Sequence, residues 1–317
     1  MAMTDSLKWT ARDIPDLTGR TSIVTGANSG LGFHTTRGLA GHGAAVTMAV
    51  RDTAKGETAA AQIRAELPSA DITVARLDLA DLASVRDFAT AWSAEHPDGL
   101  DLLINNAGVM AIPKRSTADG FEMQFGTNHL GHFALTGLLL PALVAQPRSR
   151  VVTVSSGAHR LGRMNFDDLM GDKSYRAWRT YGQSKLSNLL FTSELQRRLD
   201  ANGVPILALA AHPGYASTNL QAVGPDMSGR SWMKAPIDLA TKVLAQSAEM
   251  GALPTLFAAT APGLPGNSYV GPDGFMEQRG HPRLVDRSAA AKNRDDAKRL
   301  WEVSETLTSV HYPLEVS

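Results

Sequence analysis

Tyr181 and Lys185 are a pair of side chains whose types and spacing could do chemistry. Four residues apart on a helix, they would lie on one face, one turn from each other. A phenol has an unperturbed pKa of about 10, and a nearby ammonium group favours the phenolate and lowers that pKa. The pair could therefore exchange a proton with a substrate hydroxyl or carbonyl oxygen. Such pairs also occur on ordinary solvated helix faces, so the rest of the chain must decide between the two interpretations.

The composition excludes several other classes of function. The 317 residues contain no cysteine, which removes disulfides, thiolate nucleophiles and cysteine-bound metals. No His/Asp/Cys set has the spacing of a zinc site, so we expect no metal. Lys plus Arg equals Asp plus Glu at 31 each, without a basic block, which argues against nucleic acid as a partner. Residues 1–20 resemble neither a signal peptide nor a membrane span, and we expect a soluble, cytoplasmic protein.

Short β-rich runs alternate with longer helical stretches from Thr21 onward. This alternation predicts βαβ units: one doubly wound (Rossmann) α/β domain over residues 1–317, with a parallel sheet of about seven strands and helices on both faces. We expect a cofactor half at about 17–150 and a catalytic, substrate-binding half at about 151–317. The expected strands are 21–25, 45–50, 72–77, 101–105, 150–155, 204–211 and 268–270. The expected helices are 33–42, 53–67, 82–95, 121–145, 181–199, 237–250, 252–259 and 288–303.

Two connections are too long for the regular alternation. Residues 157–179 join the fifth strand to the Tyr181 helix, and residues 215–235 follow the sixth strand. Long ordered loops in compact domains are usually functional, so we expect both to lie over the substrate site. Packing against the rest of the domain or a second subunit is the alternative for their apolar side chains. These side chains are Leu161, Met164, Phe166, Met170, Met227, Trp232 and Met233.

Three glycines occupy the first strand-to-helix turn. Gly26, Gly30 and Gly32 have the spacing G-x-x-x-G-x-G, which differs from the literal G-x-G-x-x-G fingerprint. The physics is the same, because glycines permit a tight turn and the free N–H groups of a helix N-terminus receive a pyrophosphate. A strand before the turn and a helix after it favour a dinucleotide cofactor over an ordinary glycine-rich turn.

The end of the second strand bears on which cofactor is bound. An acidic residue there would bind the adenosine ribose of NAD(H), whereas an arginine would suit the 2′-phosphate of NADP(H). The chain reads Val50-Arg51-Asp52. We favour Arg51 as the phosphate partner, and hence NADP(H), because Arg51 directly follows the apolar residue that ends the strand. Asp52 as an NAD acid, and a surface Arg51–Asp52 pair without any cofactor, are the alternatives.

Five motifs now stand at successive strand ends. The glycine turn is followed by Asn105-Asn106-Ala107-Gly108, by Ser155-Ser156, by Tyr181 with Lys185, and by Pro213-Gly214. In this order they resemble the short-chain dehydrogenase/reductase superfamily. The runs at 128–133 and 154–159 are similar to its retinol-dehydrogenase-like and protochlorophyllide-reductase-like branch. The resemblance spans roughly residues 17–220 and implies an NADP-dependent oxidoreductase.

The resemblance implies a role for each matching catalytic residue. Tyr181 would be the general acid in reduction and the base in oxidation. Lys185 would lower the pKa of Tyr181 and hold the nicotinamide ribose. Ser156, rather than Ser155, would hydrogen-bond the substrate oxygen. Asn128 would help to hold a water that links Lys185 to solvent, and would otherwise be a helix-surface or kink residue.

The same resemblance implies a set of cofactor-binding residues. Those after the third and fourth strands would flank the adenosine half, and those after the sixth would border the nicotinamide, with Thr218 binding its amide. The full set is Gly26, Asn28, Ser29, Gly30, Leu31, Gly32, Arg51, Asp78, Leu79, Asn105, Ala107, Gly108, Tyr181, Lys185, Pro213, Gly214 and Thr218.

Four histidines near the motifs are expected to be scaffold groups, because tyrosine–lysine chemistry needs no imidazole. They are His129, His132, His159 and His212. Two features of the branch are missing. No anchor is visible at the N-terminus, which argues against a membrane-bound retinoid substrate, and the absence of cysteine argues against light-driven protochlorophyllide reduction.

We therefore expect hydride transfer between a nicotinamide and a mostly apolar ketone, aldehyde or secondary alcohol, with Tyr181 as general acid/base. One alternative is reduction of a C=C bond at the same site. Another is a catalytically silent NADP-binding regulatory or scaffold protein, against which the intact set of Asn128, Ser156, Tyr181 and Lys185 argues. Relatives are often oligomers through the helices flanking the Tyr181 segment, so we also expect a homodimer or homotetramer.

Overall fold

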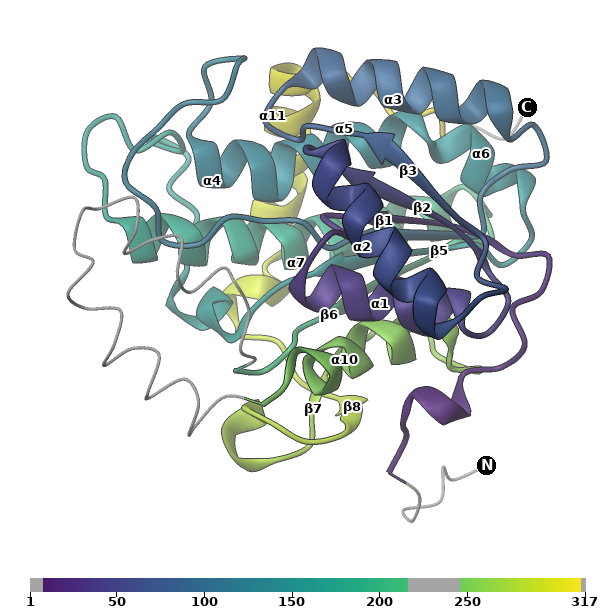
Figure 1. Cartoon of the computed structure of the whole chain (residues 1–317). Coiled ribbons are helices and arrows are strands. Elements are labelled where there is room, and N and C mark those ends of the chain that lie inside the picture. The colour runs from purple at the N-terminus through teal and green to yellow at the C-terminus, as the bar shows by residue number, and fades with distance from the viewer. Residues whose placement is uncertain (1–7, 216–245, 315–317) are drawn as a thin grey trace.

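Eight strands form one sheet through the middle of the protein (Figure 1). The computed structural model describes residues 8–215 and 246–314. The strand order is β3-β2-β1-β4-β5-β6-β7-β8, so the direction of winding reverses between β1 and β4. Neighbouring strands from β3 to β7 are parallel, and β8 pairs with β7 in the antiparallel sense. The predicted doubly wound α/β fold is confirmed.

The apolar runs predicted seven of the strands, and the eighth was missed. Their bounds are β1 Thr21–Thr25, β2 Ala45–Val50, β3 Ile72–Arg76, β4 Leu102–Asn105, β5 Arg150–Val154, β6 Leu207–Ala211, β7 Tyr269–Pro272 and β8 Pro282–Leu284. β8 gives no apolar signal, because it has three residues, begins with proline and exposes its last two side chains. It lies along β7 and covers the edge that this strand would otherwise present to solvent.

Helices cover both faces of the sheet. One core lies between the sheet and α1, α2 and α10, and another lies between the sheet and α3, α5, α6 and α7. Figure 1 shows α3, α5 and α6 above the sheet and α1 and α10 below it. The bounds are α1 Gly30–Ala40, α2 Thr53–Glu66, α3 Leu82–Glu95, α5 Gly131–Leu138, α6 Leu140–Ala145, α7 Ala177–Ala201 and α10 Ala248–Thr260.

The helix predicted over residues 121–145 is divided into several pieces. α4 (Met123–Phe125) leads into a π-helical turn, η2 (Gly126–Leu130), and α5 follows it. The helix breaks again before α6, where Pro141 lacks the N–H that would continue the ladder. A π-turn inserts an extra residue into a helix and is frequent at functional sites. Here it contains Asn128.

The C-terminal helix α11 (Arg294–Thr308) packs across α7. The contact is aromatic: the Trp301 ring of α11 stacks on the Phe191 ring of α7, with centroids 6.0 Å apart. α11 begins later than predicted, because Asn293 accepts hydrogen bonds from the first backbone N–H groups of the helix. Part of the surface of α7 is thereby covered by the chain itself. Among the helices of the two described segments, none is long and apolar enough to span a bilayer.

Several expectations fall outside the described segments. They concern Thr218, most of the loop 215–235 with its three large apolar side chains, and the first part of the helix expected over 237–250. α10 begins after its cap Ser247 and runs without a break through residue 251, where two separate helices were predicted.

Candidate active site

The expected site residues gather at the carboxyl ends of the parallel strands. Open α/β sheets bind ligands at this edge, where the strand order reverses, and here the reversal lies between β1 and β4. α7 brings Tyr181 to the same edge, because it packs beside β5. Lys185 Nζ donates a hydrogen bond to the Val154 carbonyl at 3.1 Å, and Asn188 Nδ2 donates to the same oxygen at 3.1 Å.

Tyr181 and Lys185 lie together in the protein interior. Lys185 Nζ is 5.8 Å from the centroid of the Tyr181 ring, and both side chains are buried. Burial lowers the pKa of Lys185 to about 8. Burial also raises the pKa of Tyr181 to about 12, while the Ser156 hydroxyl acts in the opposite direction. Burial therefore dominates the pKa of Tyr181, and the phenol carries its proton at neutral pH.

Asn128 is held rigidly beside Lys185. Its Oδ1 accepts from the Val109 N–H at 2.8 Å, and its Nδ2 donates to the Val109 carbonyl and to Ser184 Oγ, both at 2.9 Å. A Cβ added to Gly108 would lie 3.0 Å from Asn128 Oδ1 and 3.4 Å from Lys185 Nζ, so these three residues meet at one point. Asn128 is therefore a buried residue of the π-turn and not a helix-surface residue.

The two serines after β5 have different partners. Ser155 is buried, and its Oγ donates to the Lys185 carbonyl at 2.8 Å. Ser156 caps the short helix η3 (Gly157–Leu161), where its Oγ accepts from the Ala158 N–H at 3.2 Å. Because Ser156 Oγ acts as an acceptor in the cap, its O–H can still donate to a ligand. This difference supports Ser156 as the serine that faces a substrate.

The glycine turn has the geometry that a dinucleotide requires. Gly26 and Gly30 have φ of +64° and +55°, which strongly favours glycine. A Cβ on Gly32 would lie 2.4 Å from the Gly26 carbonyl oxygen, so α1 can start against the turn only with glycine at that position. Ser29 occupies the N-cap position of α1 but makes no side-chain cap bond. The first N–H groups of α1 can therefore receive a phosphate.

Two other helices of the same edge, α2 and α3, are closed by their own caps. Asp52 Oδ1 accepts from the Lys55 N–H at 3.1 Å and begins α2, and Asp81 caps α3 in the same way. Asp52 is also paired with the Lys55 ammonium at 3.3 Å, whereas Arg51 is exposed at the end of β2. Within the described residues no group of three His, Asp or Glu side chains could hold a metal ion. The residues present thus fit a phosphate-bearing cofactor at α1.

The turn after β4 is bound to β1 through Thr25, a link that the motif analysis missed. Thr25 Oγ1 accepts from the N–H groups of Asn106 and Ala107, both at 2.9 Å, and Asn106 Nδ2 donates to the Thr25 carbonyl at 2.7 Å. His132 Nε2 lies 2.9 Å from Thr25 Oγ1, and its Nδ1 lies 3.0 Å from the Asn128 carbonyl. One buried network therefore connects β1 and the turn after β4 to the π-turn that contains Asn128.

Asp78, Leu79 and Asn105 lie where the strand ends predicted, but they serve the scaffold as well. Asp78 Oδ1 accepts from the Ala80 N–H at 3.0 Å. The Leu79 carbonyl lies against Gly131, whose Cβ would stand 2.4 Å from it. The Asn105 side chain turns into the core and donates to Thr136 Oγ1 on α5 at 3.0 Å. Asn105 therefore presents its backbone, not its side chain, to the strand-end edge.

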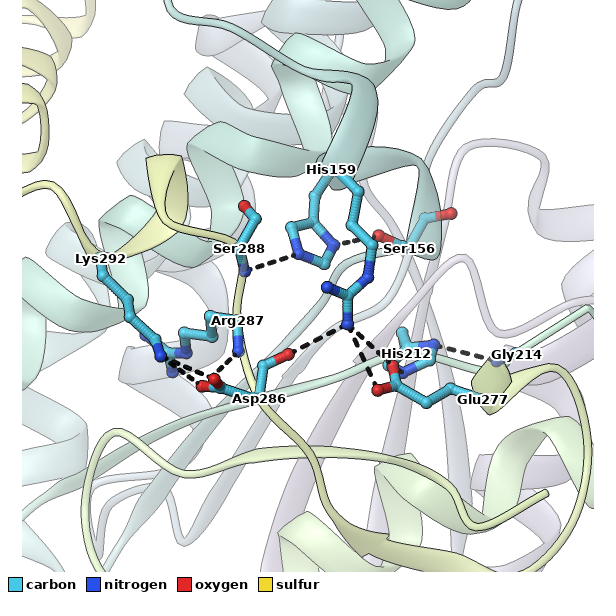
Figure 2. A network of polar contacts seen from close by, with 10 residues as sticks. Ser156, His159, His212, Gly214, Glu277, Asp286, Arg287, Ser288 and Lys292 are labelled. Atoms are coloured by element: carbon cyan, nitrogen blue, oxygen red, sulfur yellow. Dashed lines mark hydrogen bonds and ion pairs between the residues drawn. The ribbon is translucent and has the colours of Figure 1, made fainter. Parts of the chain in front are cut away.

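The four histidines behave as buried scaffold groups. Burial lowers the pKa of His129 to about 3 and the pKa of His132 and His159 to about 4. These three rings are therefore neutral at physiological pH. His159 Nδ1 lies 2.7 Å from the Ser156 carbonyl, and His212 lies beside Glu277 (Figure 2). The sequence analysis expected these four histidines to be scaffold groups without a part in proton transfer, and their contacts support that expectation.

Most of the apolar side chains of the 157–179 loop pack against the protein. Met164, Phe166 and Met170 contact the core between α7 and α11, whereas Leu161 is 72% exposed. Trp178, the second residue of α7, is also exposed, and its ring stands edge-on to Tyr181 with centroids 6.0 Å apart. The loop thus packs on the core with three of its apolar side chains. A large apolar surface beside Tyr181 comes from Trp178 instead.

Known proteins are similar to this chain over almost its whole length. The family model for short chain dehydrogenase matches residues 20–227. Human retinol dehydrogenase 11 is 42% identical over 288 residues, which cover 91% of this chain and 85% of that protein. Human retinol dehydrogenase 13 is 42% identical over 296 residues, which cover 93% and 86%. A crystal structure of an uncharacterised protein from Mycobacterium paratuberculosis is 50% identical, with a TM-score of 0.80 and coverage of 97% and 100%.

Proposed function

The chain belongs to the short-chain dehydrogenase family, in its retinol-dehydrogenase-like branch, and we propose that it is an NADP(H)-dependent oxidoreductase whose general acid/base is Tyr181. The substrate would be a mostly apolar ketone, aldehyde or secondary alcohol. The observation that carries the proposal is the meeting of Tyr181, Lys185, Ser156 and Asn128 at the carboxyl edge of the sheet, beside an uncapped α1.

The catalytic step follows from the protonation states of these groups. A bound nicotinamide would supply or accept the hydride. In reduction, Tyr181 is protonated at neutral pH and can donate its proton to the substrate oxygen as negative charge develops there. Ser156 would stabilise the same oxygen, and a preorganised donor of this kind is worth about 3–4 kcal/mol in other enzymes. In oxidation, Tyr181 must first lose its proton, which the Lys185 ammonium beside it favours.

The preference for NADP(H) is supported by the different contacts of Arg51 and Asp52. Asp52 is used as the cap of α2 and as the partner of Lys55, so its carboxylate is already engaged. Arg51 lies exposed at the end of β2, where the 2′-phosphate of a cofactor held at the α1 turn would arrive. A planar guanidinium binds a phosphate through two parallel hydrogen bonds.

The substrate class is supported by the relatives and by the surroundings of Tyr181. The matching relatives are named for the dehydrogenation of retinol, an alcohol. The exposed Trp178 ring beside Tyr181 offers an apolar contact surface. We propose an apolar carbonyl or alcohol on this basis, and the alternatives are a C=C bond reduced at the same site and an NADP-binding protein without turnover.

Replacement of Tyr181 by Phe tests the proposal. A panel of ketones, aldehydes, alcohols and enones is followed at the NADPH and NADH absorbance, and the products are identified. We expect Tyr181→Phe to lower turnover by about a hundredfold or more without weakening NADPH binding. Tyr312→Phe is the matched control, because the Tyr312 hydroxyl donates to the Phe133 carbonyl at 2.7 Å in the remote aromatic core. Turnover that survives in Tyr181→Phe would refute the assignment, and a saturated ketone product from an enone would favour C=C reduction.

A homodimer or homotetramer also remains our proposal. Because α11 covers part of α7, such an assembly would have to use a surface beyond that contact. Light scattering on the purified protein measures the mass directly, and a monomeric mass would refute the proposal.

A further inference from the structure

The segment after β7 holds a partly buried carboxylate next to the candidate site. In the short helix η5 (Phe275–Glu277), the Glu277 side chain is only 20% exposed, whereas Phe275 and Met276 are 86% and 72% exposed. The turn therefore directs its acid inward and its apolar side chains outward, the reverse of the usual arrangement. Met276 and Glu277 have φ of +51° and +57°, a left-handed backbone that side-chain-bearing residues adopt only when surrounding contacts enforce it.

One contact of Glu277 reaches the loop that begins at Ser156. Arg160 Nη2 lies 3.3 Å from each carboxylate oxygen of Glu277 and donates to the Asp286 carbonyl at 3.2 Å. Arg160 belongs to η3, the helical turn that Ser156 caps. Its neighbour His159 is neutral, donates from Nδ1 to the Ser156 carbonyl at 2.7 Å and accepts from the Ser288 N–H at 3.4 Å (Figure 2). Glu277 thus anchors the turn that carries the substrate-facing serine.

The other contact of Glu277 reaches the loop after β6. His212 Nε2 lies 3.2 Å from Glu277 Oε2, and His212 Nδ1 accepts from the Gly214 N–H at 3.3 Å (Figure 2). Because Nδ1 accepts a hydrogen bond, the ring hydrogen is on Nε2, the nitrogen that lies next to the carboxylate. The carboxylate therefore favours the tautomer that holds Gly214. Pro213 and Gly214 form the loop expected to border the nicotinamide.

We propose that Glu277 is a positioning residue that sets the spacing between the Ser156 turn and the Pro213–Gly214 loop. The inference rests on the proposed function, since that spacing matters if Ser156 contacts the substrate oxygen while the loop contacts the nicotinamide. Glu277 itself touches neither reacting group. Glu277 lies beyond residue 227, where the match to the family model ends. A residue outside the matched region would therefore position two loops that belong to it.

A double-mutant cycle tests the coupling of Glu277 to Ser156. Glu277→Gln keeps the shape of the side chain and removes its charge. In the wild-type background we expect Glu277→Gln to lower kcat about tenfold with little change in KM. In the Ser156→Ala background it should lower kcat by less than about twofold, because no positioned hydroxyl remains to be displaced. Equal losses in the two backgrounds would refute the proposal.

Hydrogen exchange of the ligand-free protein supplies a measurement that needs no turnover. Glu277→Ala should speed exchange in residues 157–161 and in residues 212–215 together. The matched control is Glu194→Ala, because Glu194 is a buried carboxylate that joins Arg197 and Arg198 on α7. Unchanged exchange in either segment, or the same change in the control, would refute the proposal. If the wild-type protein turned over no substrate while Glu277→Ala still sped exchange in both segments, the proposed function would be contradicted and the positioning role of Glu277 would stand.

Discussion

The buried position of Lys185 lowers the free energy of unfolding of the protein. Its ammonium group is buried, its Nζ donates to the Val154 carbonyl, and burial lowers its pKa from 10.5 to about 8. At neutral pH the group is still charged, and keeping it so in the folded state costs about 3 kcal/mol relative to the unfolded chain. A buried charge with a strongly lowered pKa is typical of a residue kept for chemistry. This cost is present below about pH 8 and decreases as the pH rises from there towards 10.5.

Arg51 gives a prediction on cofactor choice. Arg51→Ala should weaken NADPH binding about tenfold or more, because a hydrogen bond to a charged group contributes about 1.5–3 kcal/mol. The affinity for NADH should change less than about twofold, since NADH lacks the 2′-phosphate. Fluorescence titration of both cofactors measures the difference. Lys55→Ala is the control, because it removes a nearby cation that pairs with Asp52. Equal losses for the two cofactors would exclude a 2′-phosphate role for Arg51.

Among the elements, α1 differs from α2, α3 and α10 in its N-terminus. Aspartate caps begin α2 and α3, and Ser247 Oγ accepts from the Met250 N–H at 3.2 Å to begin α10. Ser29 makes no such bond, although it stands at the same position of α1. An unused cap leaves part of the stability of a helix unrealised, and it keeps the N–H groups and the positive end of the helix dipole open to an anion.

This difference predicts opposite effects on stability and on binding. Ser29→Asp should cap α1 and raise the free energy of unfolding of the cofactor-free protein by about 0.5–1 kcal/mol. The same carboxylate should weaken dinucleotide binding about tenfold or more, because it would repel the pyrophosphate. Urea unfolding and a cofactor titration measure the two effects. In the control Ser247→Asp, cofactor affinity should not change, and undiminished affinity in Ser29→Asp would place the phosphates elsewhere.

For the molecule as a whole, buried histidines link several layers of the fold. His129 Nε2 lies 2.8 Å from Ser304 Oγ and so joins the π-turn to α11. His132 joins the π-turn to β1, and His159 joins the Ser156 turn to the segment before α11. Burial holds the pKa of each of the three at about 3 or 4, against about 6.5 for an exposed histidine. The three rings are therefore protonated at a much lower pH in the folded protein than in the unfolded chain.

Stability should accordingly decrease on acidification below about pH 6.5. Between that pH and about pH 4 the unfolded chain binds up to three more protons at these sites, so the free energy of unfolding should fall by up to about 4 kcal/mol per pH unit. Above about pH 6.5 the contribution of these sites is constant. Urea unfolding across this range measures the slope, and His132→Asn should reduce it by about a third. A stability that does not change between these pH values would show that the rings titrate normally.

Features whose signal lies within a few neighbouring residues could be predicted from the sequence. Apolar runs located seven strands, the glycine spacing located the turn before α1, and the helical spacing placed Tyr181 one turn from Lys185. The family resemblance that these motifs carry also pointed to Ser156 and Asn128. Such features depend on local backbone preference and on side-chain periodicity, which a sequence displays directly.

Features that depend on distant partners could not be predicted. The raised pKa of Tyr181 follows from burial by the whole fold. The need for glycine at position 131 follows from the close approach of the Leu79 carbonyl, and the inward turn of Glu277 follows from its contacts with Arg160 and His212 on two other loops. Desolvation, steric contact and ion pairing act between residues that are far apart along the chain. Their outcome is fixed only when packing brings those residues together.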